Sequence, residues 1–219
     1  MIEGLSTEIT HRKLNHMQKI LLSAISLIIS VSLLVGAPVT EKKGDVNIKR
    51  MLKELIVKKN LSILDIGCGP GNMIKYLSFN KYFGFDSDKK YISYASKKYK
   101  DCNFFCEIFS KSSINKIDKV DVVMLFGLLH HISNNEALEL LENVKLTLKK
   151  NSKIVILDPV FIESQNPIAK FLIKNDRGNF VRTADEYQEI FKQTNLRTSY
   201  KIYHQKIVPY THIVSEIKN

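Results

Sequence analysis

The sequence is short of cysteine and lacks the spacings that cross-linked or metal-bound domains need. Its 219 residues include three cysteines, at positions 68, 102 and 106, and no Cys-x-x-Cys pair. This odd count indicates neither a disulfide framework nor a zinc site. We expect a reduced, intracellular protein in which Cys102 and Cys106 pack beside a strand. Repeats and low-complexity tracts are also missing from the sequence, and its five prolines fall near predicted element ends or in loops.

Acidic residues are scarcer than basic ones. The chain has 33 Lys and Arg against 22 Asp and Glu, a formal net charge of +11. Such an excess favours a nucleic acid or a phospholipid surface when it is focused on one face. Here the lysines occur singly or in pairs along nearly the whole chain, as in Lys42-Lys43 and Lys149-Lys150. We interpret them as a solvated surface, on one globular domain with an appendage.

One long uncharged run lies near the N-terminus. Residues 20–39 carry no charge over about the length that spans a hydrocarbon core. Serines and Gly36-Ala37-Pro38 dilute the run, so three interpretations stay open: a membrane span, a packed helix that caps a sheet, and the core of a signal peptide. Lys and Arg are more frequent after the run, which would place the following domain on the cytoplasmic side. We assign 1–45 to an N-terminal hydrophobic helical extension and 46–219 to the globular domain.

Helical and strand patterns alternate from Val46 onward. Apolar residues at helical spacing and short apolar runs predict helices and strands respectively. Thr183 and Glu186 form a capping box that opens the last helix. We predict helices at 46–59, 73–79, 89–99, 134–148 and 183–194, and strands at 61–66, 81–86, 103–108, 120–126, 153–157, 197–203 and 207–216. This order indicates an α/β sheet, mostly parallel, that ends in an antiparallel hairpin.

Glycines follow the first predicted strand at alternate positions, in Asp65-Ile66-Gly67-Cys68-Gly69-Pro70-Gly71. Glycine allows a sharp turn and a close approach of the backbone to a ligand, and the helix expected next would offer its free N–H groups. A dinucleotide fingerprint places its third glycine one position later, where this chain has Asn72, so the spacing disfavours NAD. The segment resembles the D/E-x-G-x-G-x-G signature of Rossmann-like (class I) S-adenosylmethionine-dependent methyltransferases.

The resemblance covers about residues 60–159 and implies a doubly wound, mostly parallel seven-stranded sheet with S-adenosyl-L-methionine as cofactor. Asp86, which ends the second predicted strand, would accept hydrogen bonds from both ribose hydroxyls; taken alone, it could instead cap the next helix. Relatives often hold the adenine amino group with an Asp after strand three, where this chain has Glu107 and Ile108, so we expect backbone contacts there. The implied cofactor-binding residues are Asp65, Gly67, Cys68, Gly69, Gly71, Asp86, Ser87, Glu107, Ile108 and Phe126.

Two histidines follow the fourth predicted strand. Leu129-His130-His131-Ile132 is similar to the L-H-H-L segment of small-molecule methyltransferases. Asp158 ends the fifth predicted strand, and parallel neighbours place their carboxyl ends on one edge, so these side chains should meet. A histidine polarised by a carboxylate is a general base for a hydroxyl acceptor. We therefore predict His130, His131 and Asp158 as the catalytic set, with packing or helix capping as the alternative for each.

Residues that contact the acceptor are less clearly marked. Arg177 and Arg182 could bind an anionic acceptor or lie on the surface, and Tyr210 and His212 are weaker candidates. We predict a cytoplasmic methyltransferase that acts on a small molecule, preferably at oxygen; membrane association through residues 20–39 stays open. Two alternatives stay open: a nucleic-acid methyltransferase, suggested by the charge although the Asn/Asp-Pro-Pro-Tyr motif is missing from the sequence, and a membrane-tethered, non-catalytic cofactor-binding module.

Overall fold

The computed structural model describes residue 56, residues 60–205 and residues 209–218 of the chain. The predicted extension 1–45, with its uncharged run at 20–39, lies outside the described residues. So does nearly all of the predicted helix 46–59. Within the described ranges, no helix is both long and apolar enough to cross a membrane.

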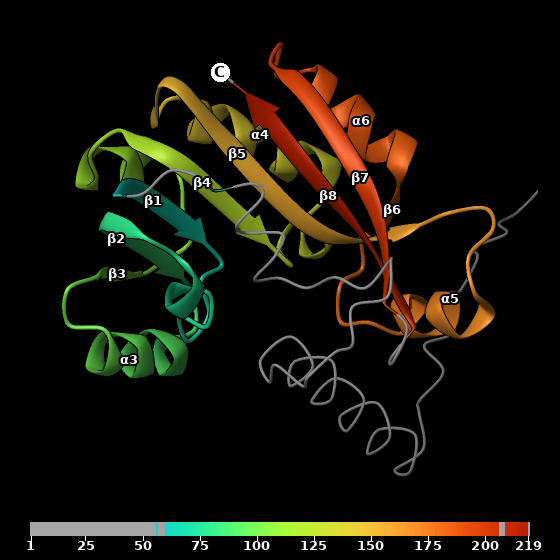
Figure 1. Cartoon of the computed structure of the whole chain (residues 1–219), viewed down its shortest axis with the longest axis horizontal. Helices are drawn as coiled ribbons and strands as arrows, with labels where there is room; N and C mark the ends of the chain where they lie inside the picture. Colours follow the sequence, from blue (N-terminus) through green and yellow to red (C-terminus); the bar gives the residue numbers. More distant parts are fainter. Residues whose placement is uncertain (1–55, 57–59, 206–208, 219) are drawn as a thin grey trace, which may run out of the picture. The chain divides into compact units, whose positions relative to one another are not determined.

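A single sheet organises the described part of the chain (Figure 1). Its strands run in the order β3-β2-β1-β4-β5-β8-β7, and a short strand, β6, pairs with β5 beside this path. The strands are β1 (Leu61–Ile66), β2 (Phe79–Asp86), β3 (Asn103–Cys106), β4 (Val120–Phe126), β5 (Leu148–Phe161), β6 (Arg182–Thr183), β7 (Arg197–Gln205) and β8 (Tyr210–Lys218). Five parallel strands, β1 to β5, are followed by an antiparallel β7 and β8 pair, which confirms the predicted seven-stranded path and its hairpin.

Helices and short 3₁₀ turns connect the strands. The α-helices are α3 (Lys89–Lys98), α4 (Asn134–Lys145), α5 (Pro167–Lys174) and α6 (Ala184–Lys192), and the 3₁₀ turns are η1 (Ile74–Tyr76), η2 (Lys111–Lys116) and η3 (Leu129–His131). Ser133 and Thr183 cap α4 and α6 through capping boxes, which satisfies N–H groups that a helix start leaves unpaired. The predicted capping box at Thr183 is thereby confirmed.

Strand alternation divides the core between the two faces of the sheet. Leu64, Val123 and Leu125 belong to the larger cluster, which also contains the buried faces of α4 and α6. Their strand neighbours Ile63 and Met124 belong to a smaller cluster. Because successive side chains on a strand point to opposite faces, the two clusters cover opposite sides of the sheet. The central strands are buried on both faces, as their nearly continuous apolar sequences predict.

Two connections differ from the sequence prediction. The helix predicted at 73–79 is wrong: after the glycines the chain forms only η1, because β2 already pairs with β1 at Phe79 and few residues remain for a full helix and its exit. The structure also contains α5, which we did not predict; Asn166 caps it, with Pro167 in its first turn. This helix lies in the connection between β5 and β6, where we predicted no helix or strand.

Candidate active site

The glycine loop after β1 has left-handed backbone at three positions. Gly67, Gly69 and Gly71 have φ angles of 75°, 51° and 77°, a region that other residues rarely adopt. The N–H groups of Gly67 and Cys68 both donate to the Phe85 carbonyl of β2, at 2.8 and 3.0 Å. The loop therefore folds back over the carboxyl end of β2. The helix start that we expected to follow it is replaced by η1.

Asp86 joins the end of β2 to the glycine loop. Its Oδ2 accepts from the Gly69 N–H at 2.9 Å, and its Oδ1 accepts from the Asp88 N–H at 2.8 Å. The helix cap that we considered for Asp86 is made by Asp88, which accepts from the N–H groups of Lys90 and Tyr91. Each Asp86 oxygen retains a free lone pair, because a carboxylate has about four acceptor positions. Asp86 is thus fixed in place with acceptor capacity to spare.

Asp65, near the end of β1, and Cys68, within the loop, have side chains that point into the protein interior. The Tyr82 hydroxyl donates to the Asp65 carboxylate at 2.6 Å, and burial raises the pKa of Asp65 to about 7. Burial also raises the pKa of the Cys68 thiol, so this cysteine is inert at neutral pH. Of the other cysteines, Cys102 is half-buried, whereas Cys106 is exposed, so our packing prediction is wrong for Cys106.

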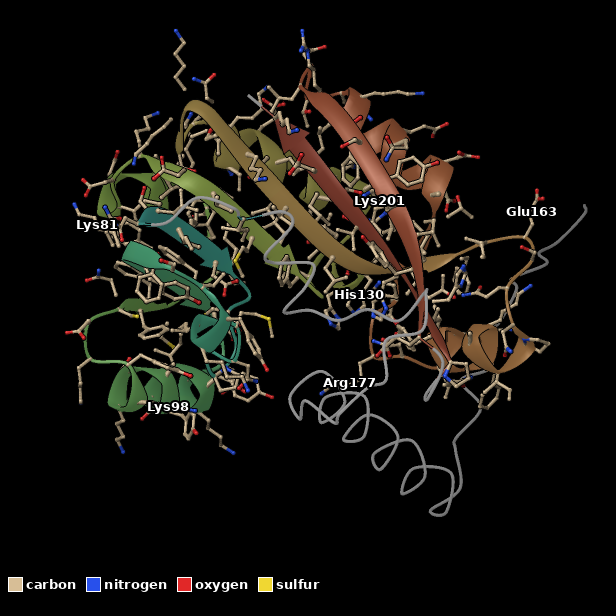
Figure 2. The ribbon with its side chains drawn as sticks, in the orientation of Figure 1. Lys81, Lys98, His130, Glu163, Arg177 and Lys201 are labelled. Atoms are coloured by element: carbon tan, nitrogen blue, oxygen red, sulfur yellow. The ribbon has the colours of Figure 1, made fainter. Side chains whose placement is uncertain are left out.

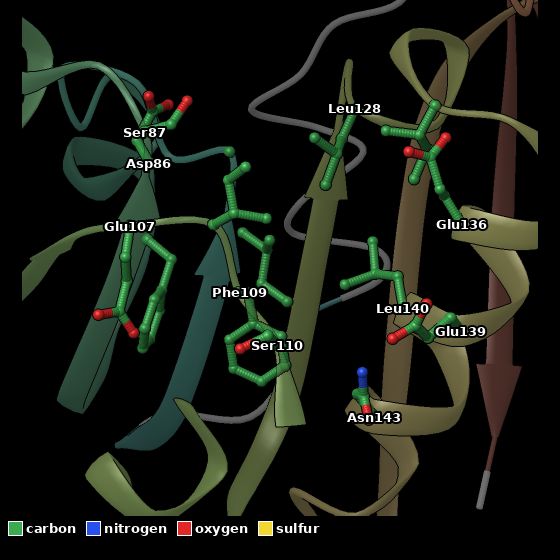
Figure 3. Close-up of a pocket in the computed structure, with 15 residues that line it drawn as sticks. Asp86, Ser87, Glu107, Phe109, Ser110, Leu128, Glu136, Glu139, Leu140 and Asn143 are labelled. Carbon is green, nitrogen blue, oxygen red and sulfur yellow. The ribbon is translucent and has the colours of Figure 1, made fainter. Parts of the chain in front are cut away.

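A pocket of about 390 Å³ opens beside the loop and Asp86 (Figure 3). One wall is the segment after β3, with Glu107, Phe109 and Ser110, and the opposite wall is α4. Its lining is formed by Ile66, Gly67, Phe85, Asp86, Ser87, Glu107, Ile108, Phe109, Ser110, Leu128, Ile132, Glu136, Glu139, Leu140 and Asn143. Five of the predicted cofactor residues therefore meet around one cavity, whose walls combine apolar side chains with several carboxylates.

Two predicted cofactor residues have side-chain positions that sequence reasoning did not anticipate. The Glu107 carboxylate pairs with Lys116 and accepts from the Ser113 hydroxyl, and these bonds lower its pKa. Glu107 is therefore held by η2. Phe126 packs with the cluster on the opposite face of the sheet from Leu125 and Phe109. The α4 residues of the pocket were missed, because a helix face pointing into a cavity has the same apolar spacing as one that packs.

His130, which follows β4, meets Asp158 of β5; the strand continues to Phe161, so the strand end that we predicted at Leu157 is wrong. His130 Nδ1 lies 2.5 Å from Asp158 Oδ1, and Asp158 Oδ2 accepts from the Leu129 N–H at 2.9 Å. Asp158 is fully buried, which raises its pKa, while the bonds from His130 and Leu129 oppose that shift. The His131 ring lies 4.0 Å from the His130 ring but is exposed. Figure 2 shows His130 at this end of the sheet. The predicted contact between Asp158 and the histidines is thus present, through His130.

Arg182 is buried and bonded to the protein itself. Its guanidinium donates to the carbonyls of Leu129, Ile132 and Phe180 and to the Asn134 side chain, at 2.7 to 3.0 Å. Both of our interpretations, anion binding and surface exposure, are wrong for Arg182. It ties the turn that carries His130 to the segment before β6. Arg177, in contrast, is exposed.

A second carboxylate lies on the other side of His130. Asp176 Oδ2 is 4.0 Å from His130 Nε2, and Asp176 accepts a hydrogen bond from the Tyr210 hydroxyl. The His212 ring lies 4.8 Å from the Tyr210 ring, and its buried Nδ1 has no hydrogen-bond partner among the described residues. The two candidates on β8 therefore join the His130 cluster. Asp176 was not predicted, since no pattern marks one aspartate in a loop.

Comparisons with known proteins agree with this geometry. Residues 63–151 match a family model described as a methyltransferase domain. The chain is 29% identical over 132 residues to the putative methyltransferase 235L of Invertebrate iridescent virus 6, a match that covers 58% of this chain and 48% of that protein. The aligned segment is therefore about half the length of that relative.

Solved structures share the fold. The plantazolicin methyltransferase BpumL, in complex with a monoazolic desmethylPZN analogue and SAH, is 24% identical, with a TM-score of 0.57 over 78% of this chain and 81% of that one. A SAM-dependent methyltransferase from Archaeoglobus fulgidus is 16% identical, with a TM-score of 0.63 over 78% and 93%. The matched family model covers residues 63–151, and these likenesses show that the described fold is the one seen in S-adenosylmethionine-dependent methyltransferases.

Proposed function

We propose that this protein transfers the methyl group of S-adenosylmethionine to an oxygen atom of a small molecule. The observation that carries the proposal is the arrangement along one edge of the sheet. The glycine loop after β1 is bonded to Asp86 beside a pocket, and His130, which follows the neighbouring strand β4, is paired with Asp158 of β5. Ligands of open α/β sheets bind outside the carboxyl ends of the strands. The cofactor loop and a candidate base therefore share the expected edge.

The residues around the pocket fit this cofactor. Asp86 retains acceptor capacity for two ribose hydroxyls, and Leu128, Ile132 and Phe109 supply apolar walls suited to an adenine ring. An extra Cβ at Gly69 would meet no atom within 4 Å, so the backbone there faces open space. The carboxylates in the lining suit a ligand with a positive charge, even though the whole chain has a net charge of +11.

The paired histidine can handle the proton of a hydroxyl acceptor. When bound, the cofactor supplies an activated methyl group on a sulfonium, and the sulfur keeps the electron pair of the broken C–S bond. Asp158 accepts from His130 Nδ1, which leaves the lone pair of the neutral ring on Nε2. Nε2 can then take the hydroxyl proton as the new C–O bond forms. Asp158 also stabilises the imidazolium that results.

A small molecule is the acceptor class that the surroundings favour. Near His130 the chain presents two carboxylates, those of Asp158 and Asp176. The guanidinium of Arg182, which precedes α6, is occupied by hydrogen bonds to the protein. A nucleic-acid acceptor would bring phosphates, which lysines and arginines normally contact. Small acceptors also agree with BpumL, which was solved with a desmethylPZN analogue.

Calorimetry and methyl transfer test the proposal separately. We expect the full chain to bind S-adenosylhomocysteine, and purified protein to transfer radiolabelled methyl from S-adenosylmethionine to a small-molecule extract rather than to RNA. His130→Gln should abolish transfer while S-adenosylhomocysteine binding stays within about twofold, because His130 does not line the pocket. His131→Gln is the matched control and should retain most transfer. Folded protein that takes up no S-adenosylhomocysteine would refute the proposal, and transfer mainly to RNA would replace its acceptor class.

A further inference from the structure

The imidazole of His130 lies between two carboxylates that come from different parts of the chain. Asp158 of β5 contacts Nδ1, and Asp176, which follows α5, faces Nε2 across 4.0 Å. That separation is too long for a direct hydrogen bond. The His130 side chain is 7% exposed and that of Asp176 is 29% exposed. Asp176 is therefore the more exposed of the two facing groups.

Asp176 is held in a defined position. The Tyr210 hydroxyl donates to its Oδ2, and the Arg177 N–H donates to its Oδ1 at 2.7 Å. The loop that carries Asp176 is fixed against the His130 turn, because the Phe180 N–H donates to the His130 carbonyl at 2.9 Å. Gly178 packs so closely that a Cβ there would lie 2.0 Å from His130 Cδ2. A carboxylate fixed opposite the candidate base is a preorganised group.

One buried polar atom in the same cluster, His212 Nδ1, is unsatisfied among the described residues, as expected of a site that a polar ligand completes. A buried ring nitrogen without a partner is costly. The His212 ring lies 4.8 Å from the Tyr210 ring, and the Tyr210 hydroxyl donates to Asp176, so His212 belongs to the same cluster. Burial lowers the pKa of His212 to about 4, which keeps its ring neutral.

We propose that Asp176, held by Tyr210, is a second carboxylate of the acceptor site and selects acceptors with two neighbouring hydrogen-bond donors. This inference rests on the proposed function. The reacting hydroxyl donates to His130 Nε2, and an adjacent hydroxyl or ammonium donates to Asp176. One hydroxyl cannot serve both groups, since it carries a single proton and Asp176 is only an acceptor. Vicinal diols and amino alcohols offer a donor to each of His130 and Asp176. A carboxylic acid or a phosphate would instead place its negative charge against the Asp176 carboxylate, which disfavours binding.

The selection can be measured with four small probes that differ in charge and donor number. Ethylene glycol and ethanolamine carry two donors, ethanol carries one, and glycolate replaces the second donor with a carboxylate. The readout is the ¹⁵N imidazole resonances of His130 in protein saturated with S-adenosylhomocysteine. We expect the two-donor probes to half-saturate these shifts at concentrations at least about fivefold lower than glycolate or ethanol, because only they add a charge-assisted hydrogen bond to the Asp176 carboxylate.

Variants identify the group responsible. In Asp176→Asn we expect ethanolamine to lose its advantage over glycolate, because the charge is gone while the amide can still bond to Tyr210 and Arg177. Tyr210→Phe, which frees the carboxylate, should reduce the advantage in part. Arg177→Gln is the matched control and should keep the wild-type order, since its side chain is exposed.

Each outcome bears on one proposal. Glycolate binding as tightly as ethanolamine, an order unchanged in Asp176→Asn, or no response to any probe would overturn the role of Asp176. S-adenosylhomocysteine uptake, measured by calorimetry on the same samples, tests the proposed function separately. If S-adenosylhomocysteine binds but the probes follow another order, only this inference is refuted. If folded wild-type protein does not bind S-adenosylhomocysteine, the proposed function is refuted.

Discussion

Replacing Asp86 by asparagine is the sharpest test of the cofactor site. The side chain keeps its size but loses its charge and one of its two acceptor oxygens. In the structure those oxygens accept from the N–H groups of Gly69 and Asp88. An asparagine can accept only one of these bonds well, because its amide nitrogen is a donor. The substitution therefore weakens the ribose contact and releases either the glycine loop or the turn before α3.

The expected loss follows from these bonds. Charge-assisted hydrogen bonds are roughly twice as strong as neutral ones, and bonds to a charged group contribute about 1.5–3 kcal/mol each. Two weakened ribose bonds together with a loosened loop should cost about 2–3 kcal/mol of binding free energy, which raises the dissociation constant for S-adenosylhomocysteine by roughly 30- to 150-fold. Little change in global stability is expected, because the group lies at a pocket rim.

Calorimetric titration with S-adenosylhomocysteine measures this effect, and Asp88→Asn is the control. Asp88 is two residues away and caps α3 by accepting from Lys90 and Tyr91, a task that asparagine performs equally well. It is not a lining residue of the pocket. We expect Asp88→Asn to change affinity by less than about twofold. Loss below about threefold in Asp86→Asn, or equal losses in both variants, would refute the ribose assignment.

Three further predictions concern stability and the acceptor side. Arg182→Met should lower the free energy of unfolding by about 3 kcal/mol in urea titrations, because buried carbonyls lose a charged donor, whereas Arg177→Met should change it by less than about 0.5 kcal/mol. Gly178→Ala should reduce methyl transfer more than S-adenosylhomocysteine affinity, since its Cβ would meet the ring and the carbonyl of His130 rather than the pocket; equal loss of both would contradict this. For Asp65→Asn, the free energy of unfolding relative to that of the wild type should increase as pH rises from about 4 to about 7. Burial raises the pKa of Asp65 to about 7, so the folded wild type keeps a proton that the unfolded chain releases; a difference that is equal at about pH 4 and about pH 8 would be inconsistent.

The parallel half of the fold was predictable because its signals are local. Each central strand is a short apolar run, and the three glycines of the loop, all with positive φ angles, lie where the chain turns back over β2. The prediction of a helix at 73–79 was wrong because apolar spacing there does not reveal where β2 begins. Pairing between Leu61 and Phe79 decides that point, and it is a contact between strands. Local patterns fix element type better than element ends.

The candidate site was predictable only for residues that the order of the strands brings together. The rule that parallel strands end on one edge was enough to bring His130 to Asp158. No such rule applies to Asp176, which reaches His130 through α5 and its exit, or to Arg182, whose hydrogen-bond acceptors are mainly backbone carbonyls that a sequence does not distinguish. An isolated arginine before a capping box could have suggested a buried clamp, but that pattern also occurs on surfaces.

The turn from 128 to 132 links cofactor binding to acceptor chemistry. Leu128 and Ile132 line the pocket, while His130 between them points to Asp158. Arg182 holds this turn through the carbonyls of Leu129 and Ile132. Loss of the Arg182 side chain should therefore weaken both S-adenosylhomocysteine binding and methyl transfer, whereas His130→Gln affects transfer alone. A variant of Arg182 that stays folded and loses transfer with full cofactor affinity would show that the two halves of the site are independent.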